Sequence, residues 1–263
     1  MIPNNFKEWA CSLSGCDGGN IDADTWLCGI EWGGGSKGDY YTETLPKEIE
    51  NGACTPKQNI YDWKDSITYP FGRSFAKLYS AIDGENVENY SKFVSKKWDG
   101  SEIFKLNLYP IAFDSTDSTL WHTHRLKKIT GFDEKHLFQT WCFINRSPYF
   151  SKLRKEKQPK LIVCTGVSYL RDFFLFFGGN SENSATIQYE DVSPSPGSKI
   201  ENKRRFYWVR LDQHTTLVVI PFFSGSYGLN SDYLLQKIGD RIREIRAWHM
   251  QSPEVSRDYV TTL

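Results

Sequence analysis

Four short stretches of the chain are almost entirely apolar or β-branched, and helical patterns separate them. The stretches are residues 25–30, 103–108, 161–165 and 216–221. A parallel strand that helices cover on both faces reads as one continuous apolar run, because neither face meets water. We therefore predict four buried parallel strands.

Between these strands, apolar residues recur every three to four positions, as in helices with one buried face. The predicted helices are residues 71–82, 87–98, 133–144, 167–177 and 230–248. Strands that alternate with helices predict an α/β fold, here a three-layer αβα arrangement around a mainly parallel four-stranded sheet. Residues 186–192 and 206–211 predict a small antiparallel hairpin. No long linker divides the chain, so we expect one domain over residues 1–263, with residues 250–263 as a loose tail.

The composition is that of an ordinary globular protein, with 39% hydrophobic and 24% charged residues. No window approaches the roughly 18–20 apolar residues that cross a bilayer, and the first residues lack the blocks of a signal peptide. We expect a cytoplasmic monomer without a membrane partner, whose six cysteines are thiols. The formal net charge is zero. Binding to nucleic acid would therefore depend on local basic patches such as residues 152–160, 203–205 and 125–128, each of which also fits a solvated face.

The carboxyl ends of the four strands are where a ligand is expected in such a sheet. The first strand is followed by Glu31, Trp32 and three glycines that begin at Gly33. A carboxylate on a glycine-rich turn can act as a general base or stabilise a developing cation. The structural alternative is a tight turn whose glutamate is solvated.

The second and the last strand end in residues that suit nucleic acid. Asn107 offers an acceptor and a donor that match a nucleobase edge, or it closes the turn before Pro110. After the last strand, small residues suit a phosphate and two larger side chains suit wedging into a base stack, unless the segment is only a glycine loop before a helix. The candidate DNA-binding residues of this segment are Ser224, Gly225, Ser226, Tyr227 and Leu229.

In their order along the chain, these motifs resemble those of the uracil-DNA glycosylase superfamily. Residues 29–32 fit its first motif, with Glu31 at the position of the water-activating acid and Trp32 in place of a proline. Residues 69–74 are similar to the segment whose phenylalanine, here Phe71, stacks on the base, and we expect Arg73 beside it to contact DNA. Asn107 falls at the position of the base-reading asparagine.

Two later segments extend the resemblance over most of residues 25–246. Cys142 and Arg146, followed by residues 159–166, are similar to the superfamily's third helix and strand. Residues 221–225 resemble the Pro-Asn-Pro-Ser-Gly motif of the mismatch-specific branch. The resemblance implies a monofunctional glycosylase that flips a base out of DNA, hydrolyses its N-glycosidic bond and leaves an abasic site.

Departures from the motifs bear on the substrate. Phe222 stands where the superfamily has a His or Asn that stabilises the leaving base, so His122 and His124 would supply that help, unless they are surface or packed histidines. Gly33 stands where the uracil-specific branch has a tyrosine that excludes bulk at C5 of the base. We therefore expect a C5-substituted base, and the combination resembles the anti-phage branch that removes α-glucosyl-hydroxymethylcytosine from phage DNA.

No cofactor or metal is expected. Some branches of the superfamily hold an iron–sulfur cluster, and the candidate ligands here would be Cys11, Cys16, Cys54 and Cys142. The usual cysteine after the second strand is absent, which disfavours the cluster. Two alternative functions stay open: repair of uracil or mismatched bases, and non-catalytic DNA binding on the same fold. A hydrolase of free small molecules lacks support, because the chain has neither a Gly-x-Ser-x-Gly elbow nor a phosphate-binding loop.

Overall fold

A computed structural model of the chain describes all but 27 of its residues in six ranges, namely 1–33, 39–54, 61–97, 100–115, 117–199 and 201–251. The last two glycines of the predicted glycine-rich turn, residue 98 of one predicted helix and the predicted tail from residue 252 onward lie outside these ranges. No helix of the described residues is long and apolar enough to cross a membrane.

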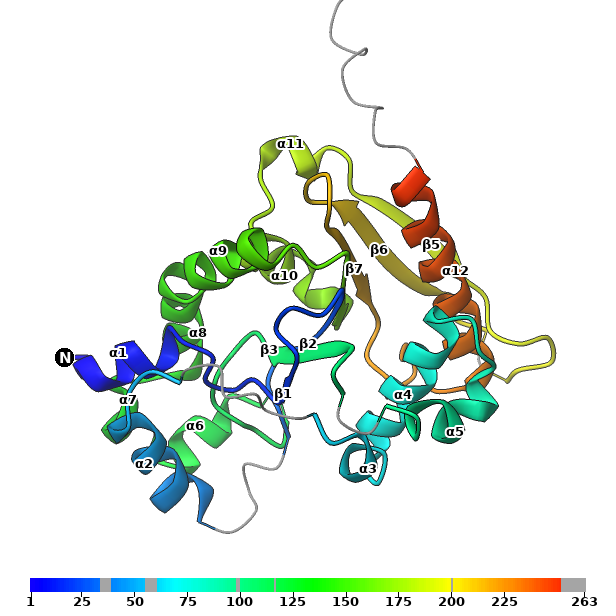
Figure 1. Ribbon diagram of the computed structural model, residues 1–263. Coiled ribbons are helices and arrows are strands. Elements are labelled where there is room, and N and C mark those ends of the chain that lie inside the picture. Colours follow the sequence, from blue (N-terminus) through cyan, green and yellow to red (C-terminus); the bar gives the residue numbers. More distant parts are fainter. Residues whose placement is uncertain (34–38, 55–60, 98–99, 116, 200, 252–263) are drawn as a thin grey trace, which may run out of the picture.

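One mixed sheet of seven strands, in the order β1-β3-β2-β4-β7-β6-β5, runs through the centre of the molecule (Figure 1). The strands are β1 (Gly18–Gly19), β2 (Thr25–Gly29), β3 (Ile103–Asn107), β4 (Leu161–Thr165), β5 (Gln188–Val192), β6 (Arg204–Arg210) and β7 (Thr216–Ile220).

The four middle strands of the sheet, β3, β2, β4 and β7, are parallel to one another. All residues of these strands are buried, which explains why each reads as a continuous apolar run. The predicted parallel strands are confirmed, each to within one residue at its end.

The predicted hairpin forms as β5 and β6, but it is not a separate unit. Strand β6 pairs antiparallel with β7, so the hairpin continues the central sheet. At the opposite edge the short strand β1, which the sequence did not reveal, pairs antiparallel with β3. The prediction of a four-stranded sheet is therefore corrected to seven strands.

Side chains of successive strand residues enter two different cores, because strand residues alternate between the faces of a sheet. On β2, Trp26 and Cys28 belong to one cluster, and Leu27 belongs to the other. The helices on the first face are α1 (Asn4–Ala10), η1 (Tyr40–Thr44), α2 (Leu45–Glu50), α6 (Thr119–Thr123), α8 (Lys135–Asn145), α9 (Ser147–Lys157) and α10 (Leu170–Phe176).

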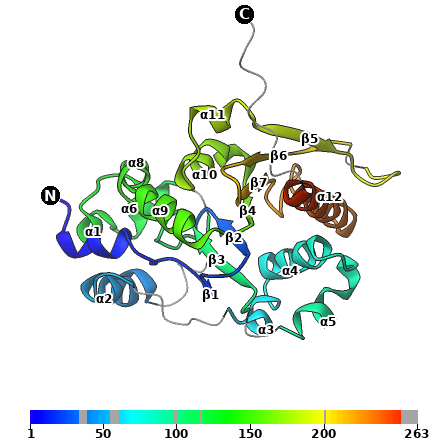
Figure 2. The ribbon, with the colours of Figure 1, turned by 45° about the horizontal axis from the view of Figure 1, so that its top comes forward.

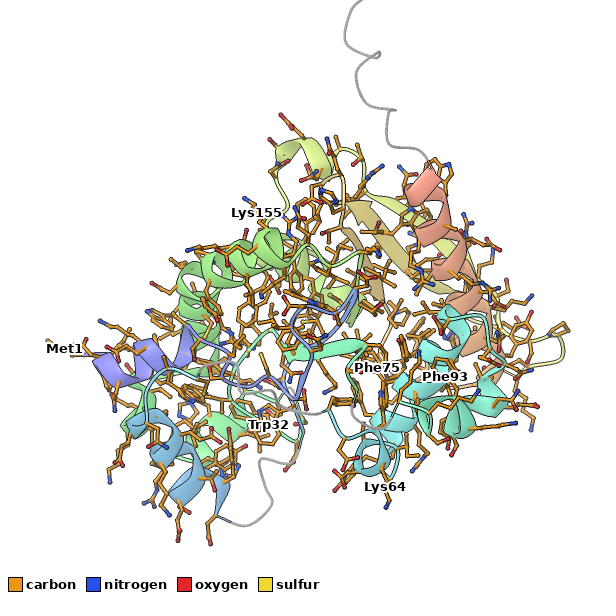
Figure 3. All side chains as sticks on the ribbon, viewed as in Figure 1. Met1, Trp32, Lys64, Phe75, Phe93 and Lys155 are labelled. Atoms are coloured by element: carbon orange, nitrogen blue, oxygen red, sulfur yellow. The ribbon has the colours of Figure 1, made fainter. Side chains whose placement is uncertain are left out.

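The second face carries α3 (Trp63–Ser66), α4 (Pro70–Ile82), η2 (Val87–Asn89), α5 (Tyr90–Val94) and α12 (Asp232–Gln251). Helices α4 and α12 pack side by side (Figure 2). Phe75 on α4 and Phe93 on α5 both belong to the core of this face (Figure 3). The remaining short helices are α7 (Lys127–Thr130), η3 (Val167–Tyr169) and α11 (Ser181–Ser184).

The predicted helix over residues 87–98 is the one whose described part differs most. It is divided into the short helices η2 and α5 and ends at Val94. Lysine and serine interrupt its apolar face, so too few side chains reach the core to hold a longer helix. The other predicted helices are found, although that over residues 167–177 begins as the separate 3-10 helix η3.

Candidate active site at the strand ends

The loops after the parallel strands lie beside one another at a single edge of the sheet. Backbone hydrogen bonds continue past the ends of β2 and β3, from Leu108 N to Gly29 O at 3.0 Å and from Tyr109 N to Ile30 O at 2.8 Å. Beyond β4, Gly166 N donates to Ile220 O of β7 at 2.7 Å. Residues far apart in the sequence are therefore held together where a ligand is expected.

Glu31, two residues after β2, has a buried side chain that is only 5% exposed. Its Oε1 accepts a hydrogen bond from Nζ of Lys135 on α8 at 2.9 Å. Its Oε2 is buried and has no hydrogen-bond partner among the described residues. A buried carboxylate oxygen without a partner is costly, so Oε2 is a place where a water molecule or a substrate group would be stabilised.

Burial raises the pKa of Glu31 to about 7, although the adjacent Lys135 ammonium opposes this rise. Three tyrosines close to the carboxylate come from three different elements: Tyr41 from η1, Tyr109 from the loop after β3, and Tyr169 from η3. Burial raises the pKa of each tyrosine, so their hydroxyls stay neutral. A carboxylate that titrates near neutrality fits general acid–base chemistry.

Lys135 is a further functional candidate, which the sequence motifs did not single out. It is the first residue of α8, is 2% exposed in its side chain, and lies over the ring of Phe113 with Nζ 3.8 Å from the ring centroid. The available signal was its spacing: Lys135, Phe138 and Cys142 are the buried residues of α8 and follow helical periodicity. A lysine on the apolar face of a helix points to a buried partner.

Asn107, the last residue of β3, is 2% exposed and uses its amide group within the protein. Its Nδ2 donates to Gly15 O at 2.8 Å and to Asp17 Oδ2 at 2.9 Å. Asp17 Oδ2 also accepts from Nζ of the buried Lys105 at 2.5 Å. In this arrangement the donors that would read a base edge are occupied, which favours the structural interpretation of Asn107.

Phe71 at the start of α4 is one of the exposed aromatic side chains, at 39%. Its ring packs against Phe75 and Phe223, with centroids 5.4 Å and 5.1 Å away. Nζ of Lys105 lies 5.6 Å from the ring centroid of Phe71, which places this ring next to the group formed by Lys105, Asp17 and Asn107. The rigid, half-exposed ring is suited to stacking on a flat ligand.

Phe222, the predicted base-pocket residue after β7, lies over the backbone of Gly166 after β4. A Cβ atom at Gly166 would approach the Phe222 ring to 2.7 Å, and Gly166 has a φ of +119°. Only glycine therefore fits beneath this ring. Phe222 is 37% exposed and has the Tyr169 ring 6.3 Å away, so it adds an aromatic surface at the edge where Glu31 lies.

The other predicted pocket residues differ in their surroundings. Trp32 is half-buried with its ring 5.2 Å from that of Tyr40. A Cβ atom at Gly33 would meet nothing within 4 Å among the described atoms, so there is open space at this position. His124 stacks on Tyr41 at 3.8 Å, whereas His122 is exposed. Only His124 thus contacts a residue that lies close to Glu31.

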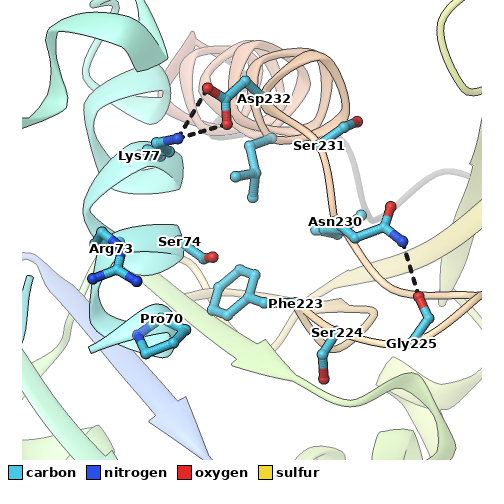
Figure 4. A pocket seen from close by; sticks show the side chains of 12 residues that line it. Pro70, Arg73, Ser74, Lys77, Phe223, Ser224, Gly225, Asn230, Ser231 and Asp232 are labelled. Carbon is cyan, nitrogen blue, oxygen red and sulfur yellow. Dashed lines mark hydrogen bonds and ion pairs between the residues drawn. The ribbon is translucent and has the colours of Figure 1, made fainter. Parts of the chain in front are cut away.

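A pocket of about 420 Å³ lies between α4 and the loop that joins β7 to α12 (Figure 4). Arg73 and Ser74 line it from α4, and Ser224 and Gly225 line it from the loop. Lys77 Nζ reaches across to Asp232 of α12, at 2.7 Å and 2.9 Å from its two oxygens. The predicted DNA-binding residues Arg73, Ser224 and Gly225 are thereby brought together, and Ser226 is exposed in the same loop.

Leu229 and Tyr227, both predicted as wedges into a base stack, have opposite environments. Leu229 is wholly buried in the core of the second face, and its backbone N donates to Phe222 O at 2.7 Å. This burial overturns the interpretation of Leu229 as a wedge. Tyr227 is 67% exposed and remains available for such a contact.

The cysteines do not form a recognisable ligand set. Cys11, Cys16 and Cys54 are half-buried, and Cys142 is buried. Within the described ranges, no group of three or more His, Cys, Asp or Glu side chains gathers in a way that would hold a metal ion.

Comparison of the sequence with protein-family models and with curated proteins gave no match.

Proposed function

We propose that this chain is a DNA glycosylase that hydrolyses the N-glycosidic bond of a modified base, on the three-layer fold of the uracil-DNA glycosylase superfamily. The observation that carries the proposal is Glu31: a buried carboxylate after a central parallel strand, with one oxygen paired and the other without a partner among the described residues. A carboxylate in this state is suited to activating a water molecule and to stabilising positive charge.

The reaction needs two contributions from Glu31. As the bond between the base nitrogen and C1′ breaks, its electron pair leaves with the base, which takes up a proton from solvent. The sugar gains oxocarbenium character, and the nearby negative charge stabilises it. Water then adds through its oxygen to C1′, and the proton that it loses passes to the carboxylate. Because burial raises the pKa of Glu31 to about 7, the group can accept this proton near neutral pH.

Recognition of the flipped base falls to Phe71. Its ring is exposed enough to stack on a base and is held by Phe75 and Phe223. Asn107 would read the base edge only after its amide group leaves Asp17 and Gly15. We therefore propose a structural role for Asn107, whose amide group holds Gly15 and Asp17 in place.

Support for the substrate class comes from Gly33, where a Cβ atom would meet no described atom within 4 Å. A base with a bulky group on C5 needs such space. We propose a C5-substituted pyrimidine as the substrate, with glucosylated hydroxymethylcytosine as the leading candidate and defence against phage DNA as the setting. Phe222 and Tyr169 add aromatic surface on which a sugar face would pack.

The pocket between α4 and the β7–α12 loop would hold the DNA backbone. Arg73, Ser74, Lys77 and Ser224 line its walls. Lys77 Nζ pairs with Asp232, and Arg73 Nη1 donates to two backbone oxygens, so the remaining donors of these side chains would contact the phosphate. Phosphate oxygens accept hydrogen bonds from such side chains and from backbone N–H groups, and these contacts set the position of the DNA without reading its sequence.

The second candidate is a DNA-binding protein without catalytic activity. It is favoured by two observations: the amide donors of Asn107 are occupied, and Phe222 offers no hydrogen bond to a leaving base. The two candidates differ in a single measurable property, the formation of abasic sites.

Exchange of Glu31 for glutamine tests the proposal. E31Q keeps the shape of the side chain and removes its charge, so we expect excision to fall by about 10³-fold or more. Binding to DNA that carries the modified base should change by less than about threefold, because the charge acts on the transition state rather than on the bound duplex. Abasic sites are scored by alkaline cleavage of labelled DNA, and binding by fluorescence anisotropy.

The matched control is E43Q, since Glu43 is an exposed glutamate that pairs with Lys47 on the surface. It should excise at the wild-type rate. An E31Q protein that excises at a near-normal rate would remove Glu31 from catalysis, and a wild-type protein that binds DNA without forming abasic sites would support the second candidate.

A further inference from the structure

Lys135 occupies a position that is unfavourable for a lysine. Its side chain is 2% exposed, and burial of an ammonium group is costly even when it is paired. It is also the first residue of α8, where the positive end of the helix dipole disfavours a cation. An apolar residue would continue the buried face that Phe138 and Cys142 form. A residue that breaks local rules in this way is expected to serve the site it touches.

The surroundings of Lys135 fix its ammonium group in one place. Nζ lies 2.9 Å from Glu31 Oε1 and 3.8 Å from the centroid of the Phe113 ring. The ring belongs to the loop after β3, and the carboxylate follows β2, so three elements meet at this group. The cation–π contact and the ion pair together hold Nζ on one side of the carboxylate.

We propose that Lys135 is the positioning residue of the site: it binds one oxygen of Glu31, keeps the carboxylate ionised and leaves the second oxygen directed at the attacking water. This inference rests on the proposed function and deepens it. Lys135 itself touches neither the base nor the sugar in this scheme; it acts through Glu31.

The charge balance around Glu31 supports this assignment. Lys135 Nζ pairs with the carboxylate of Glu31, and this carboxylate also acts electrostatically on the hydroxyls of Tyr41, Tyr109 and Tyr169. The hydroxyls stay neutral, since burial raises the pKa of each tyrosine. Lys135 is the cation that pairs with Glu31, and burial alone would favour the protonated acid.

The test compares K135M, K135R and the control K47M. Lys47 forms an exposed ion pair with Glu43, so its exchange removes a lysine charge without touching the site. Two quantities are measured for each variant: the protonation midpoint of Glu31, by NMR titration of ¹³C-labelled glutamate carboxyls assigned with E31Q, and the pH dependence of base excision.

In K135M the midpoint should move from near neutrality to above about pH 8, as for other carboxyls buried without a partner. Excision at pH 7 should fall about fivefold or more, with partial recovery at pH 9, because a smaller fraction of Glu31 is ionised. K135R keeps the charge and should keep the midpoint near that of the wild type. K47M should match the wild type in both measurements.

A K135M protein with an unchanged midpoint and an unchanged pH profile would overturn the inference. If K135M does not fold, K135Q retains a donor for Oε1 and gives the same readout. A wild-type protein without excision activity would refute the proposed function. The titration would still show whether Lys135 controls the charge of Glu31, so the two failures can be told apart.

Discussion

At the scale of single residues, the protonation of Glu31 links the candidate chemistry to stability. The pKa of the folded state is raised by burial to about 7 from an ordinary value of 4.5. The folded protein therefore holds this proton more tightly than the unfolded chain does. As the pH rises from 4.5 to 7, the unfolded chain loses this proton before the folded protein does, and the free energy of unfolding decreases. This decrease is absent below pH 4.5 and complete above pH 7.

E31Q should remove this pH-dependent loss, because glutamine does not ionise and still offers an acceptor to Lys135. We expect the free energy of unfolding of E31Q relative to wild type to increase by about 2–3 kcal/mol between pH 5 and pH 8. Urea denaturation at the two pH values measures this difference, in which other titrating groups cancel. A difference that is the same at pH 5 and pH 8 would show that Glu31 titrates as an ordinary solvated carboxyl.

Residue patterns in the sequence single out Glu31 and Phe71 as candidates, but they do not reveal the residues that contact these side chains. Glu31 follows from the rule that ligands bind at strand ends, whereas Phe71 was proposed from the resemblance of residues 69–74 to a superfamily motif. Lys135 is 104 positions away from Glu31, and Asp17 is 90 positions away from Asn107. Such pairs depend on how elements pack, which the local pattern does not encode. Leu229 was misread for the same reason, because its burial comes from the core of the second face.

At the scale of the elements, the strands were predictable and many helices were not. The parallel strands are buried on both faces, so each produces an unbroken apolar run. Helix α1 has seven residues and is held by Phe6 and Trp9 in the core of the first face. A helix this short has little stability of its own, so its sequence carries only a weak helical signal. The sheet was predicted with too few strands for two reasons. Strand β1 has only two residues, and the hairpin β5–β6 was expected to be a separate unit, because the local pattern does not encode the pairing of β6 with β7.

Arg146, at the junction of α8 and α9, ties the N-terminal loop to the loop after β3. It is fully buried and donates to Ala10 O at 2.6 Å, Ser12 O at 2.9 Å and Ser14 O at 2.7 Å, and to Leu108 O at 3.2 Å. These segments flank Asn107 and Asp17. The guanidinium therefore holds these segments together beside Asn107 through its several fixed donors.

R146M should destabilise the protein by about 3 kcal/mol or more, because it leaves several buried carbonyl oxygens unpaired. The control is R171M. Arg171 is 82% exposed and pairs only on the surface with Asp172, so its loss should change stability by less than about 1 kcal/mol. Chemical denaturation of both variants measures the contrast. Equal stability of R146M and R171M would mean that the N-terminal loop does not depend on Arg146.

At the scale of the whole molecule, a net charge of zero gives no general attraction to DNA. Affinity would come from the pocket between α4 and the β7–α12 loop and from capture of the flipped base. Under the proposed function, a C5 group of the base would add contacts near Gly33, where a Cβ atom would meet no described atom within 4 Å. Uracil has only hydrogen at C5, and a mismatched thymine has only a methyl group. Under the proposed function, both would therefore make fewer contacts near Gly33.

Excision of a C5-substituted base with the help of Glu31 is tested by one assay. The protein is incubated with otherwise identical DNAs that carry uracil, a mismatched thymine, hydroxymethylcytosine or glucosylated hydroxymethylcytosine, and abasic sites are scored over time beside the E31Q protein. We expect the wild-type protein to form abasic sites and the E31Q protein to form none. We also expect faster excision of glucosylated hydroxymethylcytosine than of uracil. Excision of uracil alone would contradict the substrate class, and the absence of abasic sites from every DNA would contradict the catalytic role of Glu31.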